Sequence, residues 1–158
     1  MSVNLSNTTP AAPAGSTNVT WQTDGSGNVS AYVTSAVELT GDGFNATGQS
    51  ANIALTNLVA TPTTGRYRIS VYLIVTTVDG ASSTLPKVTL SWNDADNGQA
   101  QTMDITATQT GNLLTTFAEG DAFLSVGSSG ALAFQTSGYT SGTPGTMKYA
   151  IHITVEAL

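Results

Sequence analysis

The sequence contains no cysteine and very little charge. Without cysteine, the chain has no disulfide framework, thiol nucleophile or thiolate metal site. Charged residues make up 9 % of the chain, against roughly 25 % in a typical soluble domain. The formal net charge is −6, and the only basic side chains are Arg66, Arg68, Lys87 and Lys148. No basic patch can therefore neutralise a run of phosphates, which argues against nucleic acid as a partner.

Long apolar runs are also missing. Stretches such as Tyr72–Val75 are far too short to cross a bilayer, so a membrane is not expected as a partner. The first 65 residues hold no Lys or Arg. We therefore expect neither a secretory signal with a positive n-region nor a mitochondrial presequence. Thr, Ser, Ala, Gly and Asn take the place of charged residues and favour strands and turns over helices. Such a surface fits a protein that packs against its own copies or sits in a large assembly.

Residues 1–40 are predicted to form an N-terminal attachment arm. Two prolines and a glycine interrupt residues 7–17, which predicts an extended stretch. In residues 18–33, apolar side chains alternate on both sides of the sequence DGSGN, which predicts a small hairpin carrying Trp21 and Tyr32. A hairpin this small has no core of its own, so we expect it to bind another protein. The side chains expected to make this contact are Val19, Trp21, Val29 and Tyr32.

Residues 41–158 are predicted to form an all-β, antiparallel sandwich of the jelly-roll type with about eight strands. Strict alternation over residues 148–156 places Tyr149 and Ile151 on one face of a strand. Residues 67–78 have apolar side chains on both faces, so this strand is expected to be buried on both sides. The remaining strands are expected at 49–60, 87–92, 101–107, 113–117, 121–126 and 131–136.

The stretch SWNDADNGQAQ, residues 91–101, has the clearest potential for chemistry. An EF-hand register that starts at Asp94 fails, because its fifth position is Gly98 and its twelfth is Ile105. A looser calcium site, with a carboxylate from another loop, stays open as an alternative. The Asn-Gly dipeptide lies between two alternating runs and favours a hairpin turn. No metal site is therefore assigned.

The sequence does not predict an enzyme. Asp94 and Asp96 share one short turn, whereas a glycosidase needs two carboxylates that flank the sugar. His152 is the only histidine, and no G-x-S-x-G nucleophile motif is present. No catalytic residue and no cofactor is expected.

Two strings of residues resemble small structural proteins of tailed phages and prophages. Gly65–Ser70 reads Gly-x-Tyr-Arg-x-Ser, and Met147–Ile153 reads Met-x-Tyr-Ala-x-His-Ile. Both look like strands of trimeric jelly rolls similar to the tumour-necrosis-factor and complement globular heads. Residues 3–33 resemble a leader found in such phage proteins. The resemblance extends over residues 45–102 and 136–158 around these strings, and with residues 3–33 it covers most of the chain.

This resemblance implies a homotrimer on the outer surface of a virion, on the capsid or the tail. The C-terminal strand would lie near the threefold axis, with subunit contacts expected at Tyr72, Tyr149 and Ile151. The chain would be a capsid decoration (cement) protein or short head fibre of a bacteriophage. Its arm would bind the major capsid protein or another virion protein and stabilise the shell.

The alternative is a tail-fibre or receptor-binding tip protein that recognises a host glycan. In that case the loops at residues 93–98 and 137–145 are expected to bind the sugar, with Tyr139 as a stacking platform.

Overall fold

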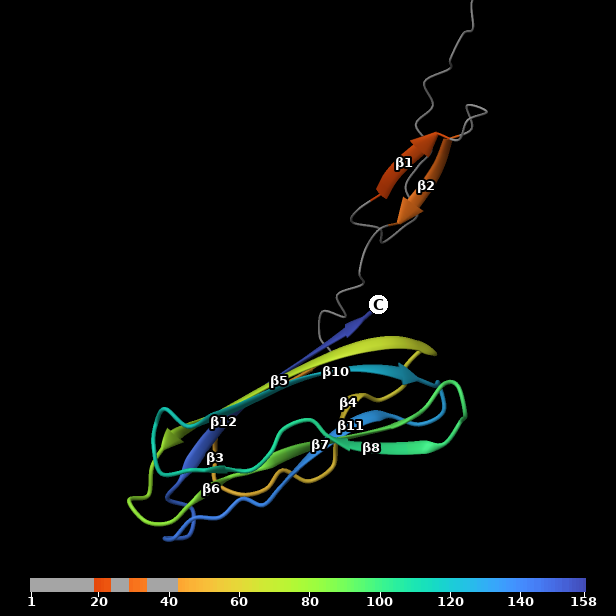
Figure 1. The fold of residues 1–158 in the computed structure, drawn as a ribbon. Helices are drawn as coiled ribbons and strands as arrows, with labels where there is room; N and C mark the ends of the chain where they lie inside the picture. The colour runs from red at the N-terminus through yellow and green to blue at the C-terminus, as the bar shows by residue number, and fades with distance from the viewer. Residues whose placement is uncertain (1–18, 24–28, 34–42) are drawn as a thin grey trace, which may run out of the picture. The chain divides into compact units, whose positions relative to one another are not determined.

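The computed structural model describes residues 19–23, 29–33 and 43–158 (Figure 1). The chain divides into two units, Met1–Ala36 and Val37–Leu158. In the first unit, β1 (Val19–Thr23) pairs antiparallel with β2 (Val29–Val33). These are the residues for which the sequence predicts the strands of a hairpin. The extended stretch expected at residues 7–17 and the DGSGN turn lie outside the described residues, as do the side-chain positions of β1 and β2.

The second unit contains two four-stranded antiparallel sheets, which Figure 1 shows as two layers. One sheet has the order β10-β5-β12-β3, formed by Phe117–Val126, Gly65–Thr77, Lys148–Ala157 and Gly43–Gln49. The other has the order β4-β11-β7-β8, formed by Thr56–Val59, Leu132–Ser137, Lys87–Asn93 and Ala100–Asp104. The short strands β6 (Thr84–Leu85) and β9 (Gln109–Thr110) form a separate pair.

The two strand orders give the topology of a jelly roll. Taken in chain order, the eight long strands fall into sheets of first-eighth-third-sixth and second-seventh-fourth-fifth. This interleaving is that of two Greek keys closed into a sandwich. The predicted all-β jelly-roll sandwich is therefore confirmed. The described residues contain no helix that could span a membrane.

The core lies between the two sheets and is supplied by alternate residues of each strand. From the first sheet come Tyr67, Ile69, Val71, Leu73 and Val75 of β5 and Tyr149, Ile151, Ile153 and Val155 of β12. From the second sheet come Val88, Leu90, Leu132 and Phe134. Burial of these side chains supplies the main driving force for folding, at about 25 cal/mol per Å² of apolar surface.

The strand predictions need three corrections. The strand expected at 101–107 ends at Asp104. The segment 113–117 is not a strand, because Leu113 and Leu114 lie exposed in a turn and β10 starts only at Phe117. Gly120, which looks like a turn residue in the sequence, lies inside β10. A side chain there would overlap the carbonyl oxygen of Ile105, so glycine permits a close approach of two segments instead of a turn.

The predicted strand at 49–60 is also interrupted. β3 ends at Gln49 and β4 begins at Thr56, with a loop between them. This loop is held to the core by the buried Tyr149, whose hydroxyl donates to the Ala51 carbonyl at 2.9 Å.

Asp79 connects the two loops that follow β5 and β11. Its carboxylate accepts hydrogen bonds from the Ala81 N–H (2.9 Å), the Ser141 hydroxyl (2.9 Å) and the Gly142 N–H (2.6 Å). Desolvation would raise the pKa of Asp79, but these hydrogen bonds outweigh it and hold the pKa below its usual value. The ionised carboxylate therefore stabilises the folded loops.

This arrangement predicts a specific pH dependence. Because the folded-state pKa of Asp79 is depressed, its contribution is complete above the unfolded pKa of about 3.9 and is lost as pH falls through the folded value. We expect Asp79→Asn to lower the melting temperature at about pH 7 and to reduce the further loss on acidification to about pH 3. Thermal melts of both proteins across this range check it; an equal acid-induced loss in both would contradict it.

Candidate functional site

The outer face of the β10-β5-β12-β3 sheet carries charged, polar and aromatic side chains side by side. We use "outer face" for the side chains of this sheet that point away from the core. On β5 they are Arg66, Arg68, Ser70, Tyr72 and Ile74; on β10, Phe117, Glu119, Asp121 and Phe123; on β12, Lys148, Ala150, His152, Thr154 and Glu156. The antiparallel register aligns them in rows across the strands, and β3 adds Asn45 opposite His152.

One end of the outer face is aromatic. The ring of Tyr72 lies 6.0 Å from that of Phe117 and stacks on His152 at 6.5 Å, measured between centroids. In the next row, Ile74 lies between Phe117 and Ala150. Phe117 is 50 % exposed, and Tyr72 and Ile74 are half-buried. Aromatic side chains contribute strongly when such a surface is covered by a partner.

The outer face is electrically balanced although the chain is acidic. It carries Arg66, Arg68 and Lys148, three of the four basic residues of the chain, together with Glu119, Asp121 and Glu156. Arg68 lies 3.4 Å from the Glu156 carboxylate and 4.0 Å from that of Asp121. Exposed ion pairs of this kind add little to stability. Their main effect here is local neutrality in a chain of net charge −6.

A hollow of about 310 Å³ lies on the same face. Small residues form part of its lining, namely Ser70, Gly120 and Thr154, while Tyr72 and Arg68 are among the larger residues around it. Ser70 donates its hydroxyl proton to Asp121 at 2.5 Å. The hollow is large enough to receive a protruding side chain of a partner.

His152 has a partner that does not support catalysis. Its Nδ1 lies 2.8 Å from the side-chain oxygen of Asn45, which can only accept, so Nδ1 carries the proton. Within residues 43–158, no Ser or Thr hydroxyl is hydrogen-bonded to His152. A nucleophile–base pair needs such a bond. His152 is therefore held as an ordered surface imidazole.

Asp94 organises the turn between β7 and β8. Its Oδ1 accepts from the backbone N–H of Asp96 (3.0 Å) and of Asn97 (3.2 Å). The Gly98 N–H then donates to the Asp94 carbonyl at 2.9 Å. Among the described residues, only glycines have a positive φ, so the turn uses Gly98 (φ 69°) but not the type I′ geometry that Asn-Gly favours. The hairpin prediction is confirmed with a longer loop.

No group of three potential metal-ligating side chains occurs in the part of the chain that the structure describes. Asp94 is engaged with the turn backbone, and the side chain of Asp96 is exposed beside it.

The predicted subunit contacts separate into two sets. Tyr72 lies on the outer face, as that prediction requires. Tyr149 and Ile151 are fully buried between the sheets of one chain, which corrects their assignment as subunit contacts. Alternation shows which residues share a strand face, but the sheet packing decides which face points inward. The residues expected to make the attachment belong to β1 and β2, namely Val19, Trp21, Val29 and Tyr32. The structure describes the backbone of these strands but not their side chains.

Tyr139, proposed as a sugar platform, is engaged in packing. Its hydroxyl donates to the Met147 carbonyl at 2.6 Å, and its ring lies 6.0 Å from that of Tyr149. The loop that carries it does border a hollow of about 440 Å³.

Sequence analysis missed Phe117, Phe123 and Ile74 as surface residues. Phe123 is 71 % exposed, and Phe117 is exposed beside Tyr72. The sequence does contain a pattern that could have located them. Small or apolar residues alternate along β10 and point inward, so its odd-numbered side chains point outward; the inward residues are Ala118, Ala122, Leu124 and Val126.

No protein-family model and no curated protein sequence matches the chain. Three solved structures show a remote likeness. One contains the CBM22-1 and GH10 modules of a Clostridium thermocellum xylanase complexed with xylohexaose: TM-score 0.38, 13 % identity, 70 % of this chain and 20 % of that chain. The CBM22-2 xylan-binding domain of a Paenibacillus barcinonensis protein has TM-score 0.38 and 8 % identity, over 72 % and 75 % of the two chains. A further CBM 22 xylan-binding domain has TM-score 0.36 and 15 % identity, over 75 % and 83 %. Likeness this remote carries no information about what this chain binds.

The turn geometry predicts unequal roles for its two acids. Asp94→Ala should lower the free energy of unfolding by about 1 kcal/mol, because two backbone N–H groups lose their acceptor. Asp96→Ala is the matched control and should leave stability unchanged, since its side chain makes no hydrogen bond within the described residues. Urea unfolding with and without calcium checks both. A calcium-dependent stabilisation that either variant abolishes would contradict the structural role.

Proposed function

We propose that this chain is a non-catalytic structural protein of a phage virion that assembles as a homotrimer through the outer face of the β10-β5-β12-β3 sheet. The observation that carries the proposal is the outer face itself, which is aromatic at one end and charge-balanced along its length. The resemblance of Gly65–Ser70 and Met147–Ile153 to trimeric phage jelly rolls supports the same oligomeric state.

Charge favours a second copy of the chain as the occupant of this face. Two chains of net charge −6 repel each other unless their contact surfaces are neutral. The outer face has equal numbers of acidic and basic side chains, so Arg68 and Glu156 of one copy can meet opposite charges of another. The pattern of β5 agrees, because Tyr72 and Ile74 continue its apolar character on the side that one chain leaves half-buried.

Attachment to the virion would use the first unit. The major capsid protein, or another virion protein, would bind Val19, Trp21, Val29 and Tyr32, and the jelly roll would stay outside. Three linked arms raise the effective concentration of each binding event, so that weak single contacts add up to firm attachment. In this role the protein is a decoration protein or short head fibre that stabilises the shell without chemistry.

Matched substitutions on the two sheets test the trimer. Ile74 on β5 and Ser91 on β7 are both half-buried and both point away from the core. We expect Ile74→Glu to weaken self-association at least tenfold, about 1.4 kcal/mol, because it buries an unpaired charge. Ser91→Glu adds the same charge on the opposite sheet and should leave association unchanged. Sedimentation equilibrium measures both.

A wild-type protein that sediments with the mass of one chain would refute the trimer. Equal weakening by both glutamates would show that added charge, and not the outer face, controls association.

The virion assignment has its own test. The chain should copurify with density-gradient-purified virions of the phage that encodes it, and antibodies should label the capsid surface in electron micrographs. Trp21→Ala should lower the amount retained on virions while the oligomeric mass stays the same. Absence of the wild-type chain from purified virions would exclude the assignment, and labelling of the tail tip would favour the receptor-binding alternative.

A further inference from the structure

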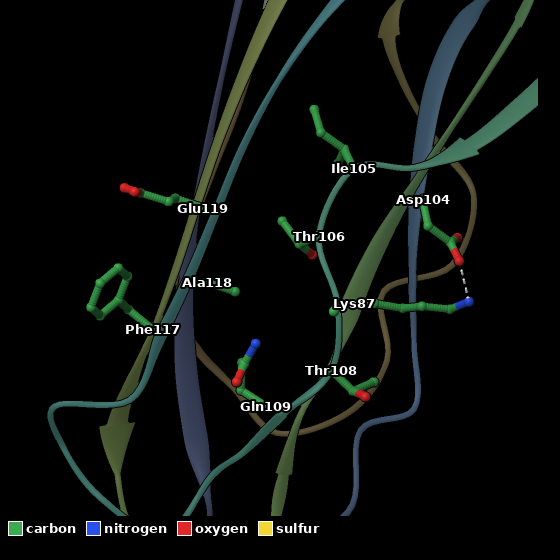
Figure 2. Close-up of a pocket in the computed structure, with 10 residues that line it drawn as sticks. Lys87, Asp104, Ile105, Thr106, Thr108, Gln109, Phe117, Ala118 and Glu119 are labelled. Atoms are coloured by element: carbon green, nitrogen blue, oxygen red, sulfur yellow. Dashed lines mark hydrogen bonds and ion pairs between the residues drawn. The ribbon is translucent and has the colours of Figure 1, made fainter.

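A third hollow, of about 670 Å³ and lined mainly by polar residues, lies at the open edge of the sandwich. Here β8 is the edge strand of one sheet and β10 is an edge strand of the other. The segment from Ile105 to Gln109 crosses between these edges, close enough to β10 that Gly120 has no room for a side chain. Figure 2 shows Lys87 and Asp104 on one side of this segment and Phe117 and Glu119 on the other.

The hollow offers hydrogen-bond donors and acceptors together. Asp104 accepts from Lys87 at 2.5 Å and from the Thr89 hydroxyl at 2.6 Å, so each of its oxygens keeps a free lone pair. Thr106 accepts the Val88 N–H at 2.9 Å and keeps its own O–H proton. The side-chain amide of Gln109 makes no hydrogen bond within residues 43–158 and supplies both a donor and an acceptor.

The charges of the hollow restrict the class of ligand. Lys87 is neutralised by its ion pair with Asp104, and Glu119 adds a negative charge. The hydrogen bond from Lys87, and after it the one from Thr89, hold the pKa of Asp104 below its usual value. Because no free cation remains in the lining, phosphate, sulfate and uronate ligands are disfavoured. A metal ion is disfavoured too, since Asp104 and Glu119 lie on opposite sides of the crossing segment (Figure 2).

The apolar part of the lining is small and suits the C–H faces of a sugar. It consists of Ile105, Ala107 and Ala118, while the ring of Phe117 points away from the crossing segment toward the outer face (Figure 2). An apolar peptide would find too little surface there, whereas a polyol presents hydroxyl groups and C–H patches in alternation. The geometry points to a binding site for a neutral oligosaccharide in this hollow. Gln109 on the β10 side of the crossing segment and the Lys87–Asp104 pair on its other side would bind hydroxyl groups of different sugar units (Figure 2).

The site goes beyond the proposed structural role and does not depend on it. Lys87, Asp104 and Gln109 belong to the second sheet and to the crossing segment, not to the outer face. Phe117 and Glu119 also belong to the outer face, so the variants leave them unchanged. Sedimentation can therefore report on the trimer while binding is measured independently.

The test uses three neutral probes, maltohexaose, cellohexaose and xylohexaose, and oligogalacturonate as an anionic probe. We expect at least one neutral probe to bind the full-length protein with a dissociation constant of about 1 mM or lower. Backbone amide signals of residues 104–109 should shift in an NMR titration. Oligogalacturonate should bind at least tenfold more weakly.

Two glutamines provide the variant and its control. Gln109→Ala should weaken binding at least fivefold, and the fold should survive because the side chain is exposed. Gln135→Ala removes an exposed glutamine from β11, outside the hollow, and should change nothing. Failure of all three neutral probes to bind would overturn the site. So would tighter binding of oligogalacturonate, or equal affinity of wild type and Gln109→Ala.

Discussion

β5 and β12 pair side by side over ten residues of β12. The register of this pairing determines which side chains of the sheet enter the core and which lie on its outer face. Both strands lie inside their sheet, with β10 and β3 at the edges. Their inward residues, including Tyr67 and Ile151, form the centre of the core. Because side chains alternate, the same register fixes which residues face outward in aligned rows. A shift by one residue would bury Arg68 and expose Ile69.

The outward rows carry a combination of properties that one chain does not need. A free sheet face is usually polar, and stability does not require Tyr72, Ile74 and Phe117 to cluster there. Nor does stability need the ion pairs of Arg68, since such exposed pairs contribute little. The aromatic cluster and the ion pairs would contribute more to stability if a partner of complementary charge covered the face. Three of the four basic residues of the chain lie on this face, where they offset its three acidic side chains.

Local sequence patterns predicted the strands and the fold class but not the direction in which each face points. Strict alternation located β5 and β12 correctly, and turn residues located the loop at Asp94. Gly120 misled the strand assignment because a glycine can mark either a turn or a close approach, and the contact with Ile105 is distant in sequence. Tyr149 and Tyr72 looked equivalent as strand aromatics, yet one is fully buried and the other lies on the outer face. Only the packing of the two sheets separates them.

The edge hollow could not be predicted because its parts come from separate strands. Lys87 lies on β7, Asp104 ends β8, and Gln109 is the last residue of the crossing segment, so no short motif joins them. The crossing itself depends on Gly120, whose missing side chain lets the segment pass between the sheets. If the outer face is covered in an assembly, the β4-β11-β7-β8 sheet and this edge are the surfaces that remain in contact with solvent. Their outward residues include the polar side chains of Thr89, Ser91 and Gln135, which suit a surface in contact with solvent.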